Sequence, residues 1–122
     1  MKRIQLGLGK HLIIDAYGIK RKKLEDLQAI KKLLRDLPKK IGMRPLGREM
    51  VKKVASDFYP TRGISGFVML YESHISLHTW PEKGCLAMDL HSCKDFNHKA
   101  VIKFLKKYWG CKKMKARVVM RG

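Results

Sequence analysis

The residues best suited to chemistry lie in one short segment, residues 72–82, which reads Glu-Ser-His-Ile-Ser-Leu-His-Thr-Trp-Pro-Glu. If this segment is a strand, alternate side chains point to the same face of a sheet. One face then carries His74, Ser76, His78 and Trp80, and the other carries Ile75, Leu77 and Thr79. Two imidazoles and a hydroxyl on one side of a strand indicate a lined site that can move protons.

A second predicted strand, residues 85–93, adds further polar groups. One of its faces is wholly apolar and consists of Leu86, Met88 and Leu90. The other face includes Asp89, His91 and Cys93. Such alternation is typical of a strand with one buried face. If the two strands are neighbours, their polar faces line the same site.

The residue types alone leave three interpretations open. A zinc site could use His74, His78, His91 and Cys93, which are all acceptable ligands, although the sequence has no Cys-x-x-Cys pair. Cys93 and His78 could instead form a nucleophile and its base. The histidines could also be structural groups that are hydrogen-bonded on a half-buried sheet face.

The segment 72–82 closely resembles the processing-site motif of the short prokaryotic S-adenosylmethionine decarboxylases, which depend on a pyruvoyl group. The resemblance continues in the family's order across most of the chain. The matching positions outside the motif are Gly9, Lys10, His11, Asp15 and Gly18, then residues 63–66 (Gly-Ile-Ser-Gly), and then Asp89 and Cys93.

In that family a serine hydroxyl attacks the preceding carbonyl, and the resulting ester eliminates and hydrolyses to leave a pyruvoyl group. The resemblance implies a proenzyme cut between Glu72 and Ser73 into a β chain, residues 1–72, and an α chain, residues 73–122. The pyruvoyl group from Ser73 would form a Schiff base with the substrate and act as the electron sink for decarboxylation. The implied reaction converts S-adenosylmethionine to the aminopropyl donor for spermidine and other polyamines, without a metal.

The resemblance also implies roles for other residues. Ser65 and His78 resemble the pair that promotes processing. Cys93 resembles the acid that returns a proton to the substrate carbon. The implied substrate-binding residues are Glu82, which resembles the carboxylate that holds the ribose hydroxyls, Phe58 or Tyr59, which would stack on adenine, and Ile75.

Some positions depart from the family's pattern. The stretch 58–63, Phe-Tyr-Pro-Thr-Arg-Gly, is one residue longer after the proline, and Lys94 replaces the glycine that commonly follows the cysteine. Because relatives of this fold decarboxylate arginine or ornithine, these amino acids are alternative substrates. A non-cleaving, basic binding module is the alternative from a different class of protein.

Hydrophobic patterns predict the elements that position these residues. A helix is expected from Leu24, with Glu25 and Asp26 in its first turn and Pro38 at its end, and a second between Asn97 and Gly110. Strands are expected at residues 8–17, 50–55, 64–71, 74–80, 85–93 and 114–120. This order predicts an α+β, two-layer sandwich with an antiparallel sheet and helices on one face. The family resemblance further implies a homodimer that forms a larger sandwich, with active sites near the interface.

Composition indicates the class of protein. A chain of 122 residues predicts a single domain, residues 1–122. Lys+Arg 28 against Asp+Glu 10 gives a formal charge of +18, which attracts polyanions. Because the basic residues are spread between apolar positions, we interpret them as solvated outer faces and expect no nucleic-acid partner. Three cysteines and the lack of an apolar run near ~20 residues predict a reduced, cytoplasmic protein without a membrane span.

Overall fold

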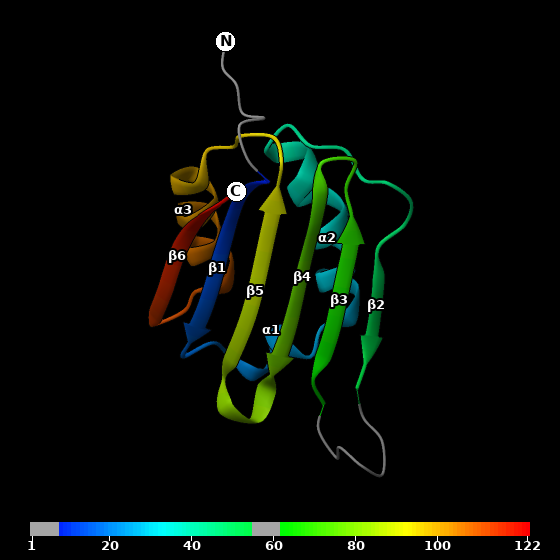
Figure 1. Ribbon diagram of the computed structural model, residues 1–122. Coiled ribbons are helices and arrows are strands. Elements are labelled where there is room, and N and C mark those ends of the chain that lie inside the picture. The colour runs from blue at the N-terminus through cyan, green and yellow to red at the C-terminus, as the bar shows by residue number, and fades with distance from the viewer. Residues whose placement is uncertain (1–7, 55–61) are drawn as a thin grey trace.

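The computed structural model describes residues 8–54 and 62–122 and shows a six-stranded sheet in the spatial order β2-β3-β4-β5-β1-β6. The elements are β1 (Gly9–Tyr17), α1 (Arg21–Leu24), α2 (Leu27–Lys40), β2 (Met50–Lys53), β3 (Ile64–Met69), β4 (Ser73–Trp80), η2 (Pro81–Lys83), β5 (Cys85–Ser92), α3 (His98–Trp109) and β6 (Lys113–Arg121). All neighbouring strands pair antiparallel. The helices cover one face of the sheet (Figure 1), which confirms the predicted two-layer α+β fold.

The core lies between this face of the sheet and the apolar stripes of α2 and α3. Side chains from both layers are fully buried there, including Leu12 and Ile75 from the sheet and Leu34 and Trp109 from the helices. Burying a side chain of this size stabilises the fold by about 1.5–3 kcal/mol. The strands are held in register by this packing, because a shift of one residue would turn their apolar side chains toward solvent.

The first helical region differs from its prediction at both ends. A separate short helix, α1, precedes α2, and Asp26 is the N-cap of α2 and not a first-turn residue, because its carboxylate accepts a hydrogen bond from the Ala29 N–H at 3.0 Å. Pro38 lies inside the last turn of α2 and does not end the helix. Proline lacks an N–H donor, but its carbonyl still accepts, here from the N–H of Met43 at 2.8 Å.

The predicted ends of the second long helix, α3, are confirmed. The Asn97 side chain accepts a hydrogen bond from the Ala100 N–H at 3.0 Å, and Gly110 ends the helix with a left-handed φ of 61°. Among the described residues, no helix is both long enough and apolar enough to span a membrane.

The sheet face opposite the helices is called the open face here, and it carries His74, Ser76 and His78 of β4. No described helix covers it (Figure 1). The burial of β4 alternates as predicted, since Ile75 and Leu77 are buried and His78 is exposed. Large apolar side chains of the neighbouring strands are also exposed, among them Met50 of β2 and Phe67 and Met69 of β3.

Thr79 joins the far end of β4 to the helical layer. Its buried hydroxyl donates to the Leu24 carbonyl at 2.8 Å and accepts from the Ile64 N–H at 2.9 Å. A buried hydroxyl with both a donor and an acceptor satisfied fixes the distance between the two layers at this point.

Candidate active site

The peptide bond between Glu72 and Ser73 lies in the tight turn that joins β3 to β4. The Ser73 N–H donates to the Leu70 carbonyl at 3.2 Å, and the Leu70 N–H donates to the Ser73 carbonyl at 2.8 Å. The Glu72 carboxylate is mostly buried, with 11% of its side chain exposed, and accepts from the Arg44 N–H at 3.3 Å. The two residues between the predicted strands 64–71 and 74–80 therefore lie in a turn that backbone hydrogen bonds and the Arg44 N–H hold in place.

The carbonyl of Glu72 is held as well, because it accepts a hydrogen bond from the Cys93 N–H at 3.0 Å. An N–H aimed at a peptide carbonyl stabilises negative charge that develops on the oxygen during nucleophilic attack. A backbone donor also polarises the carbonyl without needing to reorganise. The chain thus places a donor on the oxygen of the bond that the sequence predicts to be cut.

Two features hold the Cys93 backbone in place. Gly9 has a φ of 109°, and a Cβ at this position would collide with the Ser92 carbonyl oxygen, so only glycine allows β1 to approach so closely. The largely buried Lys10 ammonium contacts the Asp95 carboxylate at 2.8 Å and the Phe96 carbonyl at 2.9 Å, which anchors the loop after Cys93.

The Ser73 hydroxyl is hydrogen-bonded to an imidazole of the neighbouring strand. Ser73 Oγ lies 2.6 Å from His91 Nδ1, and the other ring nitrogen, His91 Nε2, lies 3.0 Å from the Leu8 carbonyl oxygen. His74 Nδ1 is also near Ser73 Oγ, but at 3.5 Å. A short serine to imidazole contact is the arrangement that activates a weak hydroxyl nucleophile.

Further polar groups of the open face surround this contact. Asp89 lies 3.0 Å from His11 Nε2 and accepts from the Ser76 hydroxyl at 3.3 Å. The His74 and His11 rings each lie 5.7 Å from the His91 ring. Burial lowers the pKa of His74, and the nearby His91 and His11 lower it further against the opposing effect of Asp89. The neutral form of His74 is therefore favoured.

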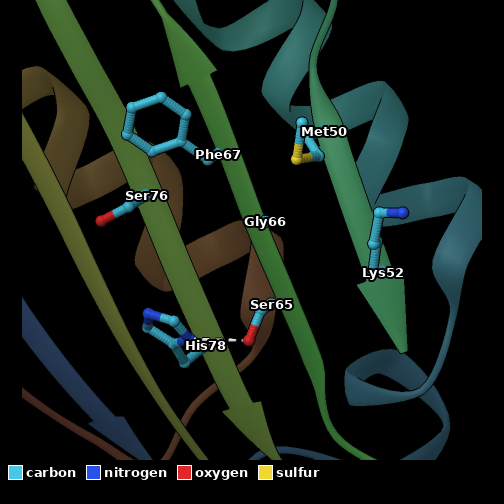
Figure 2. A pocket seen from close by; sticks show the side chains of 7 residues that line it. All are labelled: Met50, Lys52, Ser65, Gly66, Phe67, Ser76 and His78. Atoms are coloured by element: carbon cyan, nitrogen blue, oxygen red, sulfur yellow. Dashed lines mark hydrogen bonds between the residues drawn. The ribbon is translucent and has the colours of Figure 1, made fainter. Parts of the chain in front are cut away.

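Ser65 and His78 form a second group on the same face. Ser65 Oγ lies 2.9 Å from His78 Nδ1, as the dashed line in Figure 2 shows. The pair borders a hollow of about 210 Å³ that β2, β3 and β4 line with Met50, Lys52, Ser65, Gly66, Phe67, Ser76 and His78. The sequence prediction that Ser65 and His78 are partners is consistent with this contact.

These two groups are far apart within one chain. Ser73 and His78 are five residues apart on β4, which is about 16 Å at the rise of an extended strand. Glu82 lies further on, in η2 and exposed. The fold therefore gathers Glu72, Ser73 and Cys93 at one end of β4 and places Ser65, His78 and Glu82 toward the other.

Several other predictions can be compared with this geometry. Phe58 and Tyr59 lie outside the described residues. Ile75 has 0% of its surface exposed, so its side chain packs in the core and not on the open face, and its assignment to substrate binding stays a prediction. Because His78 lies far along β4 from Cys93, these two do not form a nucleophile and base pair within one chain. Among the described His, Cys, Asp and Glu side chains, no group of three or more is placed to hold a metal ion.

The contact between His91 and Ser73 is the functional feature that sequence analysis missed. The alternation of β5 placed His91 on the polar face, but the partner of a strand residue depends on register. In the structure Ser73 is paired with Ser92 and His74 with His91. Alternation along β4 places Ser73 in phase with Ile75 and Leu77, opposite to the face of His91, so the sequence pattern gave no signal of this contact.

The fold and this site together define a class of protein. A two-layer α+β chain that holds a serine hydroxyl, an imidazole and a polarised peptide carbonyl together has the groups that serine-dependent self-cleavage requires. The model of the S-adenosylmethionine decarboxylase family matches residues 10–122. The chain belongs to this family.

Individual relatives agree with the family match. The chain is 34% identical over 115 residues to an S-adenosylmethionine decarboxylase proenzyme of Clostridium botulinum, covering 93% of this chain and 94% of that protein. It is 39% identical over 94 residues to the corresponding proenzyme of Thermoplasma acidophilum, covering 75% of this chain and 66% of that protein. The crystal structure of the adenosylmethionine decarboxylase from Aquifex aeolicus superposes with a TM-score of 0.79 at 29% identity, covering 95% of this chain and 92% of that one.

Proposed function

We propose that this chain is a proenzyme that cuts itself between Glu72 and Ser73 and then decarboxylates S-adenosylmethionine for polyamine synthesis. The observation that carries the proposal is the held peptide bond, whose carbonyl accepts from the Cys93 N–H at 3.0 Å while the Ser73 hydroxyl contacts an imidazole at 2.6 Å. Nucleophile, proton acceptor and oxyanion donor therefore surround one peptide bond. The proenzyme names of the relatives support the same reaction.

The residues around Ser73 fit a pyruvoyl group made in place. Such a group supplies an electron sink for the electrons left when carbon dioxide departs. Cys93 is suited to return the proton to the substrate carbon, because it is exposed and its own N–H already contacts the carbonyl next to Ser73. The Cys93 backbone is fixed by the close approach of Gly9, so the position of the thiol depends only on rotation about the Cα–Cβ bond of Cys93.

Ser65, His78 and Glu82 would act in a homodimer. Within one chain, His78 lies about 16 Å along β4 from Ser73, which is too far for proton transfer. In such a dimer the open faces of the two sheets would face each other across a two-fold axis. If this axis runs between the sheets, perpendicular to β4 and level with the midpoint between Ser73 and His78, each Ser73 lies opposite His78 of the other copy. The two separated groups would then form two complete sites at the interface.

The chemistry of the open face supports such a dimer. Met50, Phe67, Met69 and Trp80 are 63%, 41%, 49% and 40% exposed, respectively. Exposed apolar side chains grouped on one sheet face favour burial against another surface. Facing sheets would cover them and would enclose the hollow beside His78, which lowers the local dielectric around the reacting groups.

The substrate would be S-adenosylmethionine because of the position of Glu82, an exposed carboxylate directly after β4. In the dimer this end of β4 would complete the site around Ser73 of the second copy. A carboxylate can accept two hydrogen bonds from the hydroxyls of a ribose ring. Arginine and ornithine have no ribose, so the role of Glu82 separates these substrates. Carbon dioxide release should be efficient with S-adenosylmethionine and negligible with arginine and ornithine.

Intact-mass measurement on the purified wild-type chain tests self-cleavage directly. We expect two fragments, residues 1–72 and 73–122, with the second carrying the mass of a pyruvoyl group in place of Ser73. Ser73→Ala should give a folded, uncut chain because alanine has no hydroxyl. A wild-type chain that keeps its full mass after prolonged incubation would favour the non-cleaving binding module. Preference for arginine or ornithine would overturn the substrate and leave the self-cleavage in place.

A further inference from the structure

The Ser73 hydroxyl has a proton acceptor within its own chain. His91 Nε2 lies 3.0 Å from the Leu8 carbonyl oxygen. A carbonyl oxygen is only an acceptor, so Nε2 must carry the hydrogen that is donated to it. The neutral ring then has its lone pair on Nδ1, and this atom lies 2.6 Å from Ser73 Oγ. The tautomer set by Leu8 is thus the one that can accept the hydroxyl proton.

We propose that His91 is the general base for the first step of self-cleavage, an inference that rests on the proposed function. Ser73 Oγ attacks the carbonyl carbon of Glu72 as its proton moves to His91 Nδ1. The carbon to nitrogen bond then breaks, and the same proton is returned to the Ser73 nitrogen. The products are an ester between Glu72 and Ser73 Oγ and a free amine, with no net gain or loss of protons.

The surrounding groups stabilise the developing negative charge and orient the base. The negative charge that develops on the Glu72 oxygen is met by the Cys93 N–H, already at 3.0 Å. His91 lies on β5, which pairs with β4, and its Nε2 donates to the Leu8 carbonyl. Leu8 is held in turn because its N–H donates to the Arg121 carbonyl of β6 at 2.8 Å. The ring is therefore oriented by backbone groups before the reaction begins.

Other histidines are less well placed for this role. His74 Nδ1 is 3.5 Å from Ser73 Oγ, beyond the ~3.2 Å at which a general base takes a proton directly. Burial also lowers the pKa of His74 and so weakens it as a base. His78 is about 16 Å away along β4 within the same chain. A second copy's His78 would remain available for a later proton transfer, after the ester has formed.

The test follows the mass of freshly synthesised full-length chain with time. His91→Phe keeps a planar ring and removes the base, and it should slow cleavage by about 10²- to 10⁴-fold relative to wild type. His74→Phe is the matched control, because it makes the same change on the neighbouring strand at the rival imidazole. We expect His74→Phe to cleave faster than His91→Phe, because His74 Nδ1 lies 3.5 Å from Ser73 Oγ whereas His91 Nδ1 lies 2.6 Å from it.

Hydroxylamine identifies the step that His91 assists. It cleaves esters, so it cuts the chain as soon as the ester forms and bypasses the later elimination. In hydroxylamine, His91→Phe should remain as slow as it is without it. If His91→Phe is cut in hydroxylamine at the wild-type rate, His91 acts after ester formation and the proposal is overturned.

A second variant separates the loss of a base from a structural defect. His91→Ala leaves space for free imidazole, and added imidazole should restore at least about tenfold of the lost rate if the missing group is a base. Failure of imidazole to speed His91→Ala would overturn the proposal, as would a wild-type rate for His91→Phe. If the wild-type chain itself is never cut, the proposed function fails, and this result is distinct from a failure confined to the His91 variants.

Discussion

Mixing a chain that cannot cut itself with a chain that cuts itself only slowly should restore cleavage if each site is shared between two copies. Ser73→Ala lacks the nucleophile but retains His78, and His78→Ala retains Ser73 but lacks the imidazole. Because Ser73 and His78 lie about 16 Å apart along β4, the intact His78 of the Ser73→Ala chain would lie beside the intact Ser73 of the His78→Ala chain. Such complementation is not expected if Ser73 and His78 act within one chain.

The size of the effect follows from the geometry and from random pairing. His78→Ala alone should cleave about 10²- to 10⁴-fold more slowly than wild type, the usual contribution of a positioned acid or base. In a two-fold dimer each copy presents the same surface, so an equal mixture places about half of the His78→Ala chains beside a Ser73→Ala chain. That half should cleave at close to the wild-type rate.

The assay co-expresses the two variants and follows each by intact mass, since their masses differ. A matched control replaces Ser73→Ala with the double variant Ser73→Ala/His78→Ala, which forms the same dimers but supplies no imidazole. We expect cleavage of His78→Ala in the first mixture and none above its own slow rate in the control. If the His78→Ala chain stays uncut in both mixtures although mixed dimers are present, the shared-site reasoning is refuted.

Three further outcomes check individual residues. Cys93→Ala should still cut itself, but progress curves of carbon dioxide release should show that it loses activity during repeated turnover. Cys85→Ala, at the opposite end of β5, should behave as wild type. The reverse result would exchange the roles of the two cysteines. Thr79→Val keeps the side-chain volume but leaves two buried backbone groups unpaired, so the free energy of unfolding in urea should fall by about 1–3 kcal/mol, and an unchanged value would contradict this. The pKa of His74 is lowered from 6.5 by burial, so its contribution to stability is complete above about pH 6.5 and is lost as the pH falls through the lowered value. His74→Gln should therefore reduce the loss of stability measured between about pH 7.5 and pH 5, and an unchanged loss would show that other groups cause it.

The sequence was sufficient to predict the layers because local patterns determine them. Alternation in β4 and β5 and the apolar stripes of α2 and α3 were read correctly, as were the Asn97 cap and the Gly110 end, since these features depend on residues close in the chain. The errors in the predicted ends of α2 also concern local features. Whether Asp26 is an N-cap or a first-turn residue depends on the exact start of the helix, and both choices place a carboxylate near its positive end.

The motif around Ser73 was also sufficient to predict the family, because an eleven-residue pattern with flanking matches is highly specific. It assigned Ser65 and His78 as partners, and their Oγ to Nδ1 distance is 2.9 Å. It did not reveal that this pair lies far from Ser73 in the same chain. Sequence proximity within one strand suggested a single site, whereas the extended rise of β4 separates its two ends.

The immediate surroundings of Ser73 were decided by tertiary structure alone. The Cys93 N–H meets the Glu72 carbonyl because β5 and β4 pair in one particular register, and the Ser73 hydroxyl meets His91 for the same reason. Register is fixed by packing of the buried face against the helices and by the close approach of Gly9 to Ser92. The sequence determined which groups face the open side of the sheet, and long-range packing determined which of them touch.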